Sequence, residues 1–103
     1  MVTQDSNQVQ ALRQRYKTSL SAKSESISEY VKNISASTQP NTPILNALHA
    51  DLHKLAGSSG MYGYIDIAQL TRAAMQDIAE QSDSALLQRM RDLGDLLEHH
   101  AKR

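Results

Sequence analysis

Two histidines stand four residues apart, at His49 and His53, in a stretch that reads LHADLHKLAGSSGMYGY from residue 48. A neutral imidazole can act as a nucleophile, as a general base or as a metal ligand. Gly57 and Gly60 follow shortly after His53. Glycine inside a helix costs about 1 kcal/mol relative to alanine, so two glycines in one helix predict that something approaches the helix closely.

The helix that carries these histidines is predicted from a stripe of apolar residues. Leu45, Leu48, Leu52, Leu55 and Ser59 share one face when successive residues turn by about 100°. His53 then lies about 120° from the centre of this stripe, at the rim or on the solvent side. The same strip as His53 holds mostly small residues and predicts a docking surface for a partner, made by His49, Ala56, Gly57 and Gly60.

Helical periodicity also dominates the rest of the chain, and no convincing alternating strand is found. A first short helix is predicted from Val9 to Leu20, and Ser21 is expected to cap a second helix with apolar residues from Ile27 to Ile34. Residues 35–42 read as a loop, and Thr42 followed by Pro43 predicts the start of the histidine helix. Residues 60–63 mark its end. Two more helices are expected, one with apolar residues over 67–78, capped by Asp66, and one over 86–97, after a break at Ser82 or Asp83.

Together these elements predict an all-α fold, an antiparallel four-helix bundle with a short additional N-terminal helix laid against one end. Gly94, inside the last helical pattern, is expected to weaken the continuity of that helix. Tyr62 and Tyr64 are expected to cover an end of the bundle. The remaining assignments are core positions for Met61, Met75 and Met90, and solvent exposure for His99 and His100.

Length and composition limit the class of protein. The chain has 103 residues, which suits a single domain spanning 1–103. It has no cysteine, and 11 Lys and Arg balance 11 Asp and Glu, so neither a disulfide framework nor a basic surface for nucleic acid is expected. No apolar run is long enough for a membrane span or a signal core. These features predict a cytoplasmic, globular protein without a membrane anchor, and we expect a monomer.

Two enzyme-like interpretations find little support in the motifs. A spacing of four residues between His49 and His53 can hold zinc, but Ala50 stands where an HExxH motif has its glutamate, and no third ligand is evident nearby. The chain also lacks a Walker loop and a kinase-type glycine-rich loop. No resident metal or cofactor is therefore expected, and the chain is not expected to phosphorylate itself from ATP.

The run HKLAGSSGMYG from His53 to Gly63 resembles the signature of histidine-containing phosphotransfer (HPt) domains, and the resemblance extends over essentially the whole chain. It implies that His53 is the phosphorylated residue of a phosphocarrier in a two-component phosphorelay. It also implies that the partners are receiver domains of response regulators or of hybrid sensor kinases. Magnesium is then expected on the receiver.

One position departs from the family pattern. Many members carry a lysine three residues after the histidine, where this chain has Ala56. Lys54 is the nearest cation on the helix and is the candidate for stabilising a phosphoryl group. Two alternatives stay open, a non-catalytic helical module that binds a receiver or kinase, and a metal-binding bundle.

Overall fold

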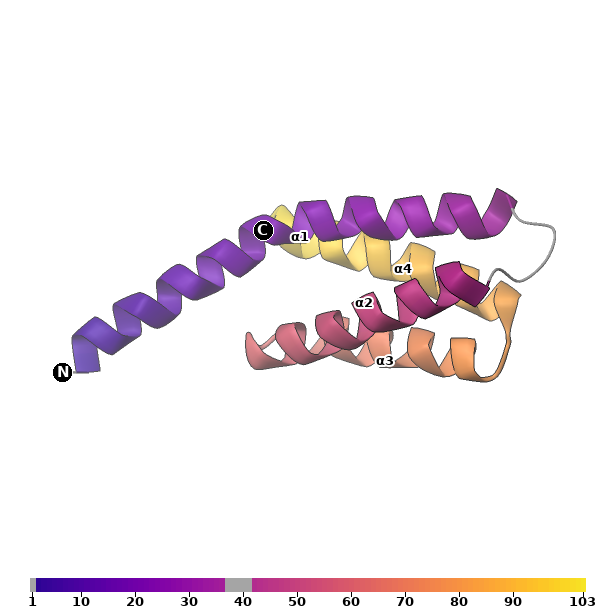
Figure 1. The fold of residues 1–103 in the computed structure, drawn as a ribbon. Coiled ribbons are helices and arrows are strands. Elements are labelled where there is room, and N and C mark those ends of the chain that lie inside the picture. The colour runs from indigo at the N-terminus through magenta and orange to yellow at the C-terminus, as the bar shows by residue number, and fades with distance from the viewer. Residues whose placement is uncertain (1, 37–41) are drawn as a thin grey trace.

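The computed structural model describes residues 2–36 and 42–103, and within these ranges every regular element is an α-helix (Figure 1). The helices are α1 (Val2–Ala36), α2 (Thr42–Met61), α3 (Ile65–Ala79) and α4 (Asp83–Ala101). Consecutive helices run in opposite directions (Figure 1). α1 packs along α4, α2 packs along α3, and α3 also packs against α4, whereas α1 touches α2 at few points. The predicted antiparallel four-helix bundle is confirmed.

The core is built from the apolar stripes of all four helices. Burying each leucine contributes about 1.5–3 kcal/mol, so these side chains hold the bundle together. α4 is continuous through Gly94, contrary to expectation, and the carbonyl oxygen of Gly94 accepts a hydrogen bond from Ser24 Oγ at 3.1 Å. The largest apolar side chains that are less than 2% exposed are Leu20, Leu48, Leu52, Ile67, Leu86, Met90, Leu93 and Leu97.

The predicted division of the N-terminal region into two helices is wrong. α1 runs without interruption from Val2 to Ala36 and includes Ser21, the expected cap. The physical reason lies in the sequence, since this segment contains neither glycine nor proline. Hydroxyl side chains also fit the helix, because Thr18 Oγ1 donates to the carbonyl oxygen of Gln14, one turn earlier, at 2.9 Å.

The N-terminal part of α1 projects away from the bundle instead of lying against its end (Figure 1). Only the later half of its predicted stripe is buried. Tyr16 and Leu20 belong to the core, whereas Val9 is 47% exposed and Leu12 is 46% exposed. The C-terminal end of α4 lies near Lys17, whose Nζ donates to the carbonyl oxygen of Arg103. The part of α1 before Lys17 therefore extends beyond the end of α4.

α2 ends in a Schellman motif. Gly63 has a φ of 86°, a left-handed conformation that glycine adopts without strain. The N–H of Gly63 donates to the carbonyl of Gly60 at 3.2 Å, and the N–H of Tyr64 donates to that of Ser59 at 2.8 Å. This motif turns the chain from α2 into α3 and confirms that the helix ends where the glycines predicted.

Three tyrosines pack together where α1 crosses the α2–α3 turn. The ring of Tyr16 stacks on Tyr62 at a centroid distance of 4.6 Å and lies 5.8 Å from Tyr64. The expectation that Tyr62 and Tyr64 cover this end of the bundle is confirmed. Met61, expected in the core, is 75% exposed, because it is the last helical residue before the turn and lies on the outer side of α2.

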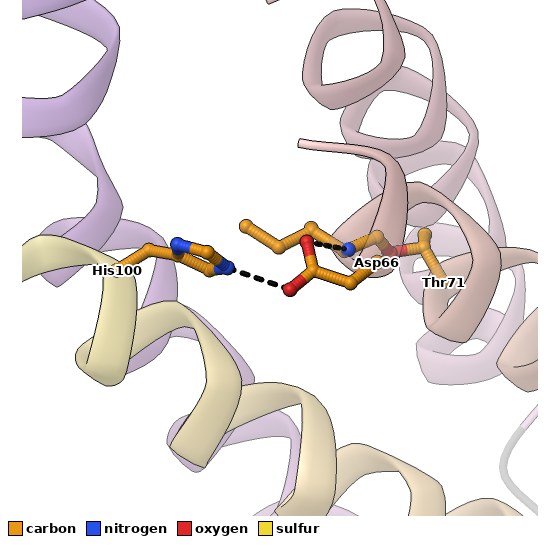
Figure 2. A network of polar contacts seen from close by, with 4 residues as sticks. Asp66, Thr71 and His100 are labelled. Carbon is orange, nitrogen blue, oxygen red and sulfur yellow. Dashed lines mark hydrogen bonds and ion pairs between the residues drawn. The ribbon is translucent and has the colours of Figure 1, made fainter. Parts of the chain in front are cut away.

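His100 is not the solvent-exposed residue that was expected. Its Nε2 lies 2.7 Å from Asp66 Oδ2 (Figure 2). Its ring also packs edge-on against Tyr64. Asp66 is also not an N-cap, since α3 begins one residue earlier at Ile65. Its Oδ1 instead accepts the backbone N–H of Ile67 at 2.8 Å. The pair therefore joins the start of α3 to the end of α4.

The Asp66–His100 pair is expected to make stability depend on pH in the acid range. Partial burial opposes the charge on Asp66, but hydrogen bonds from His100 and Ile67 outweigh it and lower the pKa of this carboxyl. A lowered folded-state pKa gives stability that is present above the unfolded value of about 3.9 and is lost as the pH falls through the folded value. Asp66→Asn should lower the free energy of unfolding at pH 7 by up to about 1 kcal/mol, because the pair is solvent-screened.

Urea unfolding of wild type and Asp66→Asn at a series of pH values measures this difference. The two curves should converge as the pH falls through the lowered pKa of the wild-type Asp66 carboxyl, where that group takes up a proton in the folded state. Asp95→Asn, which changes an exposed carboxyl on α4, serves as the control. A difference that stays constant down to the lowest pH would show that the hydrogen-bond geometry, not the charge, stabilises this corner.

Candidate functional site

His53 lies in the middle of α2 with its side chain exposed, while the leucines before and after it are buried. Leu52 is 0% exposed and Leu55 is 6% exposed, so the helix is anchored on one side and presents the imidazole on another. His49, one turn earlier, is also exposed. The structure thus places both histidines on the surface.

The two glycines of this face differ in what surrounds them. A Cβ placed on Gly57 would meet no atom within 4 Å, so the surface beside His53 is open there. A Cβ on Gly60 would lie 3.9 Å from the Cβ of Ala68, so Gly60 faces α3. Gly57 therefore leaves bare helix next to the imidazole, and Gly60 belongs to the contact between α2 and α3.

Ala56 does not belong to the exposed strip. Its side chain is only 6% exposed, because the 56 position turns toward α3 and the core. The prediction that it lines a docking surface needs this correction, and the surface around His53 is formed without it. Ser59, expected to point inward, is fully buried, and its Oγ donates to the carbonyl oxygen of Leu55 at 2.6 Å.

Lys54 lies on the side of α2 that faces α1, opposite the side that faces α3. It is exposed and lines a groove between α1 and α2 together with Lys23 and Tyr30. The hydroxyl of Tyr30 donates to Asp51 Oδ2 at 2.5 Å across this groove. The hydrogen bond to Asp51 and partial burial raise the pKa of Tyr30 to about 12, so Tyr30 stays a neutral donor. Asp51 is thereby engaged by α1, and Lys54 takes part in no ion pair among the described residues.

A second tyrosine of α1 holds the far end of the same groove. Tyr16 Oη lies 2.8 Å from Ser58 Oγ, in the last turns of α2. Sequence reasoning missed this pair, although Tyr16, Lys23 and Tyr30 recur every seven residues and so share one face of α1. Two side-chain bridges thus fix α2 where α1 and α2 otherwise touch little.

The described part of the chain offers no assembled metal centre. No group of three or more His, Cys, Asp or Glu side chains comes together within residues 2–36 and 42–103. None of the helices in these ranges contains an apolar stretch of the length that a membrane span needs.

A model of the Hpt domain family matches residues 12–101, which is most of the chain. No curated protein and no solved structure gave a match. The chain belongs to the Hpt domain family. Members of this family are phosphocarriers that act with receiver domains in phosphorelays.

Proposed function

We propose that His53 accepts a phosphoryl group from the aspartyl phosphate of a receiver domain and passes it to the aspartate of another receiver. The single observation that carries this proposal is the exposed imidazole of His53 beside the open position at Gly57. A receiver has to bring its phosphoaspartate within in-line reach of the ring, and a surface without side chains permits that approach.

The transfer of the phosphoryl group from the receiver to His53 needs no further reactant. One ring nitrogen of neutral His53 attacks phosphorus, the P–O bond to the receiver's aspartate breaks, and the electron pair of that bond stays on the aspartate carboxylate. The ring keeps its hydrogen on the other nitrogen and becomes a cationic phosphoimidazole. Lys54 offsets negative charge on the phosphoryl oxygens, and the magnesium ion is bound by the receiver.

A receiver domain phosphorylated with acetyl phosphate labelled in its phosphoryl group tests this function. We expect label to move to this chain and to be stable in base but labile in acid, as phosphohistidine is. ATP and magnesium alone should leave the chain unlabelled, because the sequence has no phosphate-cradling loop. Binding of the receiver without transfer would favour a non-catalytic interaction module, and labelling from ATP alone would contradict the absence of autokinase activity.

A further inference from the structure

The contact between Gly60 and Ala68 fixes how α2 and α3 are aligned. A Cβ on Gly60 would lie 3.9 Å from the Cβ of Ala68, so these two residues face each other. The helices run antiparallel (Figure 1), so a step toward the start of α2 matches a step toward the end of α3. One turn of about four residues leads from Gly60 to Ala56 and from Ala68 to Arg72. Arg72 therefore lies across from Ala56, within one turn of His53.

The burial pattern places Arg72 on the outer side of this contact. Ala68 is 1% exposed and Ala56 is 6% exposed, so both lie between the helices. Arg72 is exposed, and it is rotated by about 40° from Ala68, away from the core. On α2, His53 is rotated outward from Ala56 by about 60°. The exposed sides of both helices thus meet at one outer surface that carries His53, Gly57 and Arg72.

Arg72 has a charge that the fold does not use. The other two charged residues of α3 are engaged, Asp66 by His100 and Asp77 by Arg89, whose Nε lies 2.8 Å from Asp77 Oδ2. Arg72 takes part in no ion pair or hydrogen bond within the described residues. A guanidinium offers a planar fork of donors that fits the oxygens of a phosphoryl group, and here it stands unpaired beside the nucleophile.

We propose that Arg72 is a phosphoryl-binding residue of this site, reaching from α3 to the group carried by His53. This inference rests on the proposed phosphotransfer at His53. Lys54 lies on the α1 side of His53 and Arg72 on its α3 side, so two cations would flank the transferred group.

The test compares Arg72→Gln, Arg72→Lys and Lys54→Gln with wild type, using a receiver domain phosphorylated with acetyl phosphate. Single-turnover rates of transfer are measured at saturating receiver, together with the lifetime of phosphohistidine after the receiver is removed. We expect Arg72→Gln to slow transfer about tenfold and to change the lifetime, with partial recovery in Arg72→Lys. Arg91→Gln, which removes an exposed arginine from α4, is the matched control and should behave as wild type.

The outcomes separate this inference from the proposed function. Absence of label on wild type would refute the proposed function itself. Label on wild type with an equal rate and lifetime in Arg72→Gln would overturn the role of Arg72 alone. A defect of Arg72→Gln that disappears at saturating receiver would also overturn it, because Arg72 would then bind the receiver rather than the phosphoryl group. Equal melting temperatures of Arg72→Gln and Arg91→Gln are required for the rate comparison, and a loss of folding specific to Arg72→Gln would likewise count against the proposal.

Discussion

His53→Gln is expected to abolish phosphorylation of this chain while leaving its helical bundle intact. Glutamine is a good helix former, and the side chain at this position is exposed, so the free energy of unfolding should change by no more than about 0.5 kcal/mol. Glutamine has no nucleophilic nitrogen, so no acceptor remains. The measurement is transfer of labelled phosphate from a receiver, with circular dichroism and the melting temperature recorded for the same preparation.

His49→Gln provides the matched control, because His49 is exposed on the same helix one turn earlier. This variant should be labelled as wild type is. Label that persists on His53→Gln and is lost in the double variant would transfer the acceptor role to His49. Label that persists even in the double variant would exclude both histidines and place the modification outside this face of α2.

The sequence could predict the helix that carries the site because that helix is governed by local rules. The leucine stripe sets which face of α2 is buried, and the position of His53 follows from the angle between successive residues. Gly63 marks the end of α2 because a left-handed residue is required there. These features depend on contacts close in sequence or on simple periodicity, and the structure agrees with them.

The predictions that were wrong concern residues whose surroundings depend on where one helix ends relative to another. Serine is a common N-cap residue, but no glycine or proline near Ser21 ends α1. A residue type that can cap a helix does not by itself break one. His100 and Met61 were assigned by their position in a pattern. His100 meets Asp66 because α4 is long enough to reach the start of α3. Met61 is exposed because it lies on the outer side of α2, just before the turn into α3. Such positions are set by tertiary packing.

Arg72 shows the same limit for the functional site. It follows His53 by 19 residues and belongs to another helix, so no motif around His53 includes it. Its place opposite Ala56 becomes visible only when the contact of Gly60 with Ala68 fixes the alignment of the two helices. Sequence could have suggested Arg72 only as a charged residue on the polar side of α3, away from its apolar stripe.

Gly57→Gln is expected to separate folding from function at the second key position of α2. The space around a Cβ at residue 57 is open, so a longer side chain meets solvent and not the core. Glycine is also the poorer helix former, so Gly57→Ala should raise the free energy of unfolding by up to about 1 kcal/mol, and Gly57→Gln should not lower it. Transfer from a receiver should nevertheless fall about 10- to 100-fold, because the added bulk stands one turn from His53, where the receiver has to approach in line.

Melting temperatures and transfer rates of Gly57→Gln measure the two effects separately, and Ala47→Gln supplies an equally long side chain at an exposed position farther from His53 on α2. The control should transfer at the wild-type rate. Phosphoramidate, a phosphodonor much smaller than a receiver, should label Gly57→Gln as fast as wild type, because it needs no bare surface around the ring. Slow labelling by phosphoramidate as well would mean that the substitution disturbs the imidazole itself. A marked fall in melting temperature would mean that Gly57 is packed against another part of the protein in solution. The face of α2 around His53 would then not be free for a receiver to dock.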